Sequence, residues 1–443
     1  MWILLYRIIY LPAFLIALPY YGIRMLRRGG YGKDFAQRLG YFPKQAPKQA
    51  GRPRIWLQAV SVGEVLSVGA LIRELKLQLN AEIILTTTTS TGYTEGCKRY
   101  AEDCLKVGLF PLDFIVFNRR SWRQIDPDII ITMESELWPE HLHEAQRRKV
   151  PVYVVNARLS DRSFRRYQSI HYLAKRLLAK PRLFFPSSVV DRHRLIQLGV
   201  GGERMGCVGN IKMDVAPREV LAKEARQLLR NDLGFRTNED DTEPLVLLGA
   251  STWPEEEAFL LNLLCSYRKE SIDCRLLLVP RHAERRAEII RLLSSDSHSY
   301  HIRSRDGNKA NNPVCIHLAD TTGELSHLAQ AADIAFIGKS LAPNKGGQTP
   351  IEAVSIGLPT VMGPNMENFR AIVDSLVRAG AAWQTDGKET TKTALKRLLN
   401  CESERQALTK AAKEWTLAQT GVSAKIAVEI ASDFSLSHRG QRG

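Results

Sequence analysis

The chain has 443 residues, of which 44% are hydrophobic and 25% are charged, and its formal net charge is +15 at pH 7. This composition is typical of a folded globular protein and excludes a largely disordered chain and a polytopic membrane protein. At ~150 residues per domain the length predicts two or three domains, and the positive charge favours anionic partners. The seven cysteines show no CxxC pair and no zinc-ligand spacing, so we expect neither a disulfide framework nor a structural metal.

Residues 1–23 form an apolar segment with one charged side chain, Arg7. A helix of this length crosses a ~30 Å hydrocarbon core at ~1.5 Å per residue, so we expect a single N-terminal membrane anchor. Pro12 and Pro19 favour kinks, which leaves a half-inserted helix as an alternative, and an apolar first helix docked on the body is another. Basic residues gather at 24–38, and by the positive-inside rule they place the body of the protein in the cytoplasm.

From residue 54 onward, short apolar runs alternate with amphipathic stretches, the pattern of a parallel sheet with helices on both faces. We therefore predict two doubly wound α/β domains at 24–215 and 244–410, a linker and loop at 216–243, and a C-terminal helix and tail at 411–443. Two such domains place a ligand cleft between them, at the carboxyl ends of the strands. The predicted strands are 54–60, 82–85, 128–132, 152–155, 183–185, 205–208, 245–249, 275–279, 314–317, 334–337 and 359–362.

Two acidic motifs follow strands of the first predicted domain. The stretch from Ser61 to Glu64 opens the first long helix and has the form of a capping box, in which the Glu64 carboxylate bonds back to the amide of the N-cap. The alternative is a general base held at the cleft, with Gly63 leaving room for a substrate. Glu134 and Glu136 follow a buried strand, either as favourable acids at a helix N-terminus or as polar groups that face the cleft.

Lys212 follows the last predicted strand of the first domain. It is either a surface lysine or a cation that neutralises a phosphate or a developing negative charge. Basic residues also gather at 158–182, with Asp161 as the only acid. We interpret this run as a solvated face or as a site for an anionic headgroup or a phosphorylated substrate. No nucleic-acid-binding motif accompanies it, so we expect no nucleic acid partner.

The strand ends of the second predicted domain carry the pieces of a nucleotide phosphate and ribose site. Arg281 follows Pro280 at a strand end, and a guanidinium grips phosphate with two parallel N–H bonds. The glycine-rich stretch 338–352 leads from a strand into a helix, so free amides and a helix N-terminus predict an anion site. Glu352 lies one turn into that helix, where a carboxylate accepts both ribose hydroxyls.

Together these motifs resemble the Kdo transferases of lipopolysaccharide assembly over nearly the whole chain. The most specific pieces are Trp56-Leu-Gln-Ala-Val-Ser-Val-Gly-Glu64, Glu134-Ser-Glu-Leu-Trp-Pro139, Gly209-Asn-Ile-Lys212, Pro280-Arg-His282 and Gly346 to Glu352. These transferases are membrane-anchored GT-B glycosyltransferases that move 3-deoxy-D-manno-octulosonic acid (Kdo) from CMP-Kdo to the lipid A precursor, lipid IVA. The resemblance implies a GT-B fold, with two Rossmann-like domains facing a central cleft. It also implies an inverting transfer at the inner membrane without a metal or cofactor.

Carried over position by position, the resemblance implies that Glu64 is the catalytic base and that Glu134 and Lys212 stabilise the transition state. The implied CMP contacts are Pro280, Arg281, Gly323, Glu324, Leu325, Thr349, Pro350, Ile351 and Glu352. The implied partners are CMP-Kdo, the lipid A precursor and an anionic membrane surface. The chain departs from the family pattern at Lys339, where a second glycine is usual, and at Gln348 and Thr349, where His and Asn are usual.

Two other interpretations remain open. A GT-B relative that uses a UDP-sugar, or a two-domain nucleotide-sugar epimerase, would share the features of the second domain. A membrane-tethered protein that binds lipopolysaccharide or acts as a scaffold would share the apolar first segment and the basic run. That scaffold would leave the carboxylates at the strand ends without a role.

Overall fold

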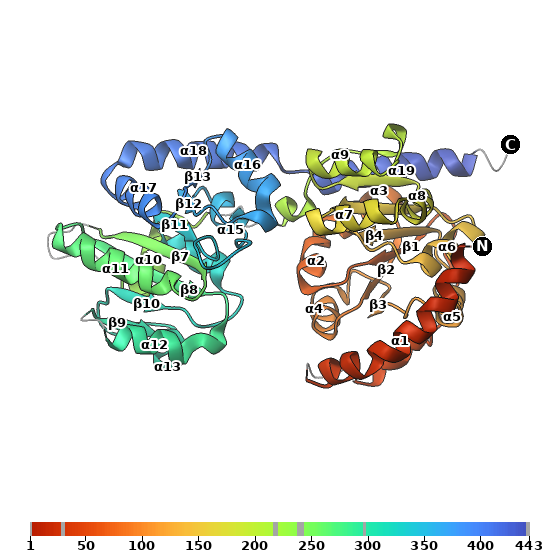
Figure 1. Ribbon diagram of the computed structural model, residues 1–443, viewed down its shortest axis with the longest axis horizontal. Coiled ribbons are helices and arrows are strands. Elements are labelled where there is room, and N and C mark those ends of the chain that lie inside the picture. Colours follow the sequence, from red (N-terminus) through yellow and green to blue (C-terminus); the bar gives the residue numbers. More distant parts are fainter. Residues whose placement is uncertain (1, 28–31, 216–219, 237–242, 296–297, 440–443) are drawn as a thin grey trace. The chain divides into compact units, whose positions relative to one another are not determined.

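The computed structural model describes residues 2–27, 32–215, 220–236, 243–295 and 298–439 (Figure 1). The chain divides into two compact units. Unit 1 comprises Met1–Val215 and Gln419–Gly443, and unit 2 comprises Ala216–Ala418. Each unit is built around one sheet in which every pairing is parallel. The predicted α/β class with doubly wound parallel sheets is therefore confirmed.

The sheet of unit 1 has six strands in the order β3-β2-β1-β4-β5-β6. The strands are β1 (Arg54–Gln58), β2 (Glu82–Thr87), β3 (Lys106–Leu109), β4 (Ile129–Met133), β5 (Val152–Ala157) and β6 (Leu183–Pro186). The chain builds outward from β1 to β3 and then crosses to β4 on the other side of β1. The strand order therefore reverses between β1 and β4, and in doubly wound sheets ligands bind outside the carboxyl ends at such a reversal.

Alternate residues of the central strands of unit 1 enter two separate cores, because successive side chains of a strand point to opposite faces. Ile55 and Leu57 of β1 belong to a core that α3 and α19 complete. Trp56 between them belongs to a core completed by Trp122 and Leu142 from α5 and α6. All three β1 side chains are fully buried. The central strands are therefore buried on both faces, as the continuous apolar runs predict.

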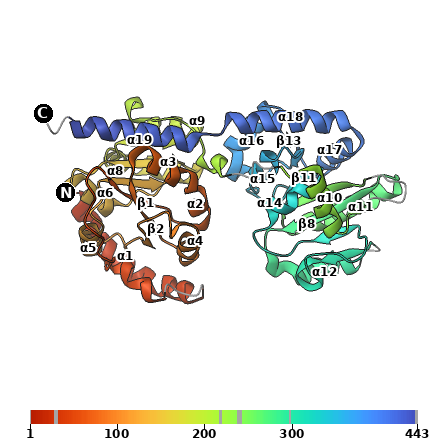
Figure 2. The same ribbon diagram turned by 180° about the vertical axis from the view of Figure 1, so that it is seen from behind.

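The helices of unit 1 cover both faces of its sheet (Figure 1). They are α1 (Trp2–Arg27), η1 (Gly32–Leu39), α2 (Val62–Ser67), α3 (Gly69–Leu79), α4 (Ser90–Tyr100), α5 (Ile115–Ile125), α6 (Pro139–Arg147), α7 (Asp161–Ser169), α8 (His171–Leu178), α9 (Val189–Gln197), η2 (Gly202–Arg204), η3 (Ile211–Asp214) and α19 (Val422–Arg439). Figures 1 and 2 both show α19, the last helix of the chain, running along α3. The C-terminus therefore returns to unit 1.

The first helix, α1, docks on unit 1 through its polar side chains, and it lies beside α5 and α6 in Figures 1 and 2. The Tyr6 hydroxyl donates to Asp113 Oδ2 at 2.8 Å, and the Arg7 guanidinium donates to both oxygens of the buried Glu140 at 2.7 and 2.9 Å. Within the ranges that the structure describes, no helix combines the length and the apolar character needed to cross a membrane. Of the alternatives that the sequence leaves open, a first helix docked on the body fits these contacts.

The sheet of unit 2 has seven strands in the order β13-β12-β11-β7-β8-β10-β9. The strands are β7 (Leu245–Thr252), β8 (Cys274–Pro280), β9 (Tyr300–Ile302), β10 (Ile316–Leu318), β11 (Ile334–Ile337), β12 (Thr360–Met362) and β13 (Trp383–Gln384). Here the order reverses between β7 and β11. The helices are α10 (Lys223–Asp232), α11 (Glu256–Lys269), η4 (Ala283–Arg285), α12 (Arg286–Ser294), α13 (Arg303–Asp306), α14 (Leu325–Leu328), η5 (Ala329–Ala331), α15 (Ile351–Ser355), η6 (Glu367–Phe369), α16 (Arg370–Arg378), α17 (Lys388–Asn400) and α18 (Glu402–Ala418).

The sequence does not predict β3, β9 or β13, and three predicted segments differ from the structure. The segment 216–243, interpreted as a linker and loop, contains helix α10, whose Arg226 and Arg230 both pair with Asp333 of unit 2 at 2.7 and 2.6 Å; positions 237–242 lie outside the described residues. The C-terminal segment from 411 carries the end of α18 and a separate helix, α19. The strand predicted at 205–208 forms only a single bridge between Phe184 and Met205.

Candidate functional site

Glu64 lies at the carboxyl edge of the unit 1 sheet, in the third position of α2. Its Oε1 accepts from Ser61 Oγ and its Oε2 accepts from the Val60 amide, both at 3.0 Å, while the Ser61 hydroxyl accepts from the Glu64 amide. The predicted N-cap, in which the Ser61 hydroxyl accepts the Glu64 amide, is therefore confirmed. The return bond differs from the prediction, because the Glu64 carboxylate accepts the amide of Val60 rather than that of the N-cap Ser61. Burial raises the pKa of Glu64 and the neighbouring Glu134 adds to this, whereas the bonds from Val60 and Ser61 and the charge of Lys212 lower it.

Glu134 follows β4 directly, on the other side of the strand-order reversal, and forms an ion pair with Lys212. Its Oε1 lies 3.0 Å from Lys212 Nζ, and its backbone has a φ of +54°, in the left-handed region. Such a conformation costs on the order of 1–3 kcal/mol for a residue other than glycine. An ion pair with side chains 25% and 34% exposed returns about 0–1 kcal/mol. The ion pair alone does not offset that cost, and the Glu134 amide also donates to the Val155 carbonyl oxygen at 2.9 Å.

Lys212 is held in place by the C-terminal helix of the chain. It belongs to η3, in which Asp214 accepts the backbone N–H groups of Gly421 and Ser423 at 2.7 and 2.6 Å, at the start of α19. Gly209 packs so tightly beneath this turn that a Cβ would lie 2.6 Å from Val422 Cγ2. The last helix therefore fixes the loop that carries the lysine.

Two further polar side chains lie at the same sheet edge: Glu136, for which the sequence left a cleft-facing position open, and Asn156, which was not predicted as a site residue. Burial raises the pKa of Glu136 to about 7, and the charges of Glu64 and Glu134 add to the effect. Asn156, at the end of β5, is 1% exposed, has a φ of +54°, and its Oδ1 has no hydrogen-bond partner among the described residues. The sequence shows that both residues follow strands but not that they face this cluster, because that depends on the tertiary fold.

In unit 2, Arg281 and Glu352 come together from loops that follow different strands. Pro280 ends β8, and the exposed side chain of Arg281 follows it. Burial raises the pKa of Glu352 in α15, whereas the charge of Arg281 and a hydrogen bond from Ser326 lower it. A cation and a partly buried carboxylate thus share the carboxyl edge of the sheet, and this pairing suits a phosphate and a ribose.

The other predicted nucleotide contacts follow β10 and β11. Gly323 has a φ of +87° and open space around it. The carboxylate of Glu324 is bound by the Arg303 guanidinium at 2.7 and 3.0 Å, and this pair lowers the pKa of Glu324. The Thr349 hydroxyl accepts from the Ile351 amide at 3.3 Å. Glu324 is therefore engaged within the protein, while the backbone at Gly323 is open to a ligand.

The start of the glycine-rich loop does not have the free amides that the sequence predicts. The backbone N–H groups of Lys339, Ser340 and Leu341 donate to the Glu256 carboxylate at 2.7 to 3.1 Å. Glu256 is 1% exposed, and it also accepts the Trp253 amide at 3.0 Å. An internal carboxylate therefore occupies the anion site that we expected a phosphate to fill at this turn.

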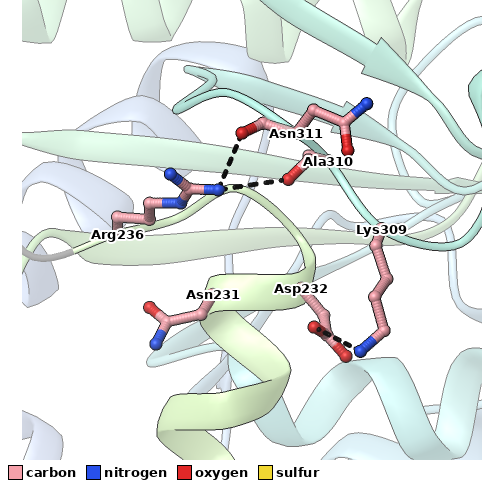
Figure 3. A pocket seen from close by; sticks show the side chains of 6 residues that line it. All are labelled: Asn231, Asp232, Arg236, Lys309, Ala310 and Asn311. Atoms are coloured by element: carbon pink, nitrogen blue, oxygen red, sulfur yellow. Dashed lines mark hydrogen bonds and ion pairs between the residues drawn. The ribbon is translucent and has the colours of Figure 1, made fainter.

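A polar cavity of about 610 Å³ lies at the opposite, amino-terminal edge of the unit 2 sheet (Figure 3). Its charged groups are engaged. Arg236 donates to the carbonyl oxygens of Ala310 and Asn311, and Lys309 lies 3.0 Å from Asp232. We therefore do not assign a ligand to it.

The part of the chain that the structure describes also lacks a group of three or more His, Cys, Asp or Glu side chains that could hold a metal ion, and metal-independent chemistry stays a prediction.

The family model described as 3-deoxy-D-manno-octulosonic-acid transferase (kdotransferase) matches residues 33–215. The 3-deoxy-D-manno-octulosonic acid transferase of Bordetella pertussis is 30% identical over 405 residues, which cover 90% of this chain and 91% of that protein. The chain belongs to this transferase family. The 3-deoxy-D-manno-octulosonic acid transferase of Haemophilus influenzae is 29% identical over 424 residues, which cover 94% of this chain and 96% of that protein. Members of the family are glycosyltransferases, and so is this chain.

Solved structures agree on the architecture of this glycosyltransferase. A glycosyltransferase from Rickettsia africae has a TM-score of 0.59 at 13% identity and covers 86% of this chain and 98% of its own. The UDP-GlcNAc 2-epimerase of Neisseria meningitidis has a TM-score of 0.56 at 12% identity and covers 87% and 100%. At this identity the likeness shows the fold alone, and it confirms the GT-B-like class that the sequence predicts.

Open space beside Gly63 gives a first test of the site in unit 1. Beyond the neighbouring residues and the backbone of its own helix, a Cβ at Gly63 would meet no atom closer than Ser61 Oγ at 4.0 Å, and alanine is a better helix former than glycine by ~1 kcal/mol. We expect Gly63→Ala to melt at or above the wild-type temperature and to lose roughly tenfold to a hundredfold in glycosyl transfer, because the methyl group displaces a substrate. The control is Gly209→Ala, which should lower the melting temperature. A wild-type transfer rate in Gly63→Ala would show that no substrate uses this space.

Proposed function

We propose that this glycosyltransferase moves Kdo from CMP-Kdo to the lipid A precursor, lipid IVA, in lipopolysaccharide assembly. The observation that carries the proposal is the cluster of Glu64, Glu134 and Lys212 at the strand-order reversal of unit 1. The relatives named above, which align with nearly the whole chain, are Kdo transferases by name. The anionic donor and acceptor also fit the net charge of +15.

In the proposed reaction Glu64 acts as the general base. Its carboxylate takes the proton of an acceptor hydroxyl, and the hydroxyl oxygen attacks the anomeric carbon of Kdo as the bond from that carbon to the CMP phosphate oxygen breaks. The electron pair leaves with CMP, and the configuration at the anomeric carbon inverts. Lys212, oriented by Glu134, stabilises the negative charge that develops. The capping bonds do not prevent this role, because each carboxylate oxygen accepts one hydrogen bond and keeps a second lone pair.

Unit 2 binds the donor in this proposal. Arg281 holds the phosphate, which becomes the leaving group, and Glu352 accepts the ribose hydroxyls. Pro280, the turn at Gly323, Glu324 and Leu325, and the segment Thr349, Pro350 and Ile351 supply the remaining contacts through backbone and packing. A guanidinium at the leaving phosphate supplies the charge stabilisation that a metal ion would otherwise provide.

The acceptor is a membrane lipid, and we propose that α1 holds the enzyme at the cytoplasmic surface of the inner membrane. One face of α1 is docked on unit 1, while its other face is apolar and exposed, with Ile8 70%, Leu15 57% and Ile16 81% exposed. A helix with such a face lies in the membrane interface and buries its apolar side chains among the lipids. Helix α7 has no buried side chain and is basic, which suits an anionic headgroup surface.

The direct test is transfer itself. Incubating the full-length protein with CMP-Kdo and lipid IVA should yield CMP and a lipid heavier by one or more Kdo residues, measured by mass spectrometry. The controls are UDP-GlcNAc and CMP without sugar, which should give no product. Release of UDP from UDP-GlcNAc, or its epimerisation, without transfer from CMP-Kdo would contradict the proposal and favour the epimerase-like alternative.

A glutamine at position 64 separates the base from the helix cap. Glutamine also serves at the third position of a capping box, but it cannot accept the proton. General-base catalysis contributes roughly two to four decades in rate, so Glu64→Gln should melt like the wild type, bind CMP normally and lose at least about a hundredfold in turnover. Burial raises the pKa of Glu64, and only the ionised carboxylate acts as a base. As the pH is lowered, the wild-type rate should therefore begin to fall at a pH higher than the ordinary glutamate pKa of about 4.3. The rate of Glu64→Gln should not show this pH dependence.

The matched control for that experiment is Ser61→Ala, which removes the N-cap hydroxyl and leaves the carboxylate. It should lower stability by about 1 kcal/mol and retain most of the turnover. Wild-type turnover in a well-folded Glu64→Gln protein would restrict Glu64 to its capping role and make Glu134 and Glu136 the next candidate bases.

The exposed face of α1 can be tested with vesicles. Burying an isoleucine side chain contributes about 1.5–3 kcal/mol. The double variant Ile8→Ser, Ile16→Ser should therefore bind phosphatidylglycerol vesicles with an affinity more than tenfold lower, measured by co-sedimentation. Transfer to acceptor in detergent should be unaffected. Leu77→Ser is the control, because Leu77 is 76% exposed on α3, away from α1 in the sequence. Equal vesicle binding by the double variant and the wild type would refute membrane association through α1.

A further inference from the structure

A lysine occupies the strand-order reversal of unit 2. Trp253 follows β7 directly and Lys339 follows β11 after one residue, so the two loops flank the position where doubly wound sheets bind ligands. Lys339 Nζ lies 4.2 Å from the centroid of the Trp253 ring. The positive charge is thus held over an indole at the carboxyl edge of the sheet.

The backbone of Lys339 is strained, with a φ of +60° in the left-handed region. The preceding Gly338 is required by packing, because a Cβ there would lie 2.3 Å from the Ser251 carbonyl oxygen. No such contact requires a side chain at 339, where glycine would adopt the same backbone without strain. Strained residues gather at ligand sites, where the surrounding structure holds them for function. Lysine at position 339 therefore accepts a backbone strain that glycine would avoid.

The charge of Lys339 has no acidic partner in the part of the chain that the structure describes. Arg281 forms no ion pair within 4.0 Å there, although its charge lowers the pKa of the nearby Glu352. The Nε1 atom of Trp253, the ring that the lysine contacts, is also without a hydrogen-bond partner among the described residues. Glu256 already accepts the backbone N–H groups of the adjacent loop. An anion that binds at this edge would therefore contact the side chains of Lys339 and Arg281 rather than these backbone amides.

We propose that Lys339 is a second anion-binding cation of the donor site, beside Arg281, and that it leaves the Trp253 ring to bind an anionic group of the donor. This inference rests on the proposed function. A CMP-linked acidic sugar carries two anionic groups, the phosphodiester and the sugar carboxylate, and the strand ends offer Arg281 and Lys339 for them. A charge-assisted hydrogen bond is stronger than a partly exposed cation–π contact, so the ligand displaces the ring.

The test compares Lys339→Gly with wild type in direct binding of CMP and of CMP-Kdo, followed by tryptophan fluorescence and calorimetry. Glycine relieves the backbone strain, so the variant should melt at or above the wild-type temperature, and weaker binding will not reflect unfolding. We expect the dissociation constant for CMP-Kdo to rise about tenfold to a hundredfold. Lys339→Arg should recover part of the affinity. Lys410→Ala, at an exposed lysine of α18, is the control and should bind like the wild type.

The two ligands identify the anionic group. Equal weakening for CMP and CMP-Kdo assigns Lys339 to the phosphate, and weakening for CMP-Kdo alone assigns it to the sugar carboxylate. Unchanged binding of both ligands to Lys339→Gly would overturn the inference and leave the lysine as a packing partner of Trp253, with the proposed function intact. A wild-type protein that binds neither ligand would overturn the proposed function and this inference with it.

Discussion

The parallel direction of every strand is the constraint on which the rest of the molecule depends. It collects the carboxyl ends of the strands at one edge of each sheet, and the reversal of strand order opens a position for a ligand there. In unit 1 the reversal between β1 and β4 brings Glu134 close enough to Glu64 for its charge to raise the pKa of Glu64. In unit 2 the reversal between β7 and β11 brings Trp253 and Lys339 into contact. Because the central strands are fully buried, the loops that follow them start from fixed points.

The sequence predicts the features that depend on local pattern. The alternation of apolar runs and amphipathic stretches predicts the α/β class and the central strands, and the spacing of Ser61 and Glu64 predicts the N-cap, although the Glu64 carboxylate bonds back to the amide of Val60 instead of that of Ser61. Short elements such as β9 and β13, with three and two residues, carry too little periodicity to be predicted. The apolar run at 205–208 is typical of a strand, but only Met205 pairs with the sheet edge.

Tertiary partners explain what the sequence does not predict. A glycine-rich loop after a strand has the same local pattern whether its amides bind a phosphate or an internal carboxylate, and here Glu256, more than 80 residues earlier in the chain, is the anion. Lys212 depends in the same way on a distant segment, because Asp214 in its turn caps the start of α19 through two charge-assisted hydrogen bonds. No pattern around Lys212 reveals that the last helix of the chain positions it.

The two interpretations of Glu64 are compatible in this structure, and the cap contributes to the proposed chemistry. A base that already accepts hydrogen bonds from Val60 and Ser61 does not have to reorganise when the substrate arrives. Those bonds favour the ionised carboxylate and so weaken its basicity, but burial and the charge of Glu134 act in the opposite direction, and the pKa of Glu64 is raised. In the proposed reaction Glu134 therefore has two effects, because it orients Lys212 and also keeps a like charge near Glu64. Basicity and fixed geometry are in this way both supplied to one carboxylate by its neighbours.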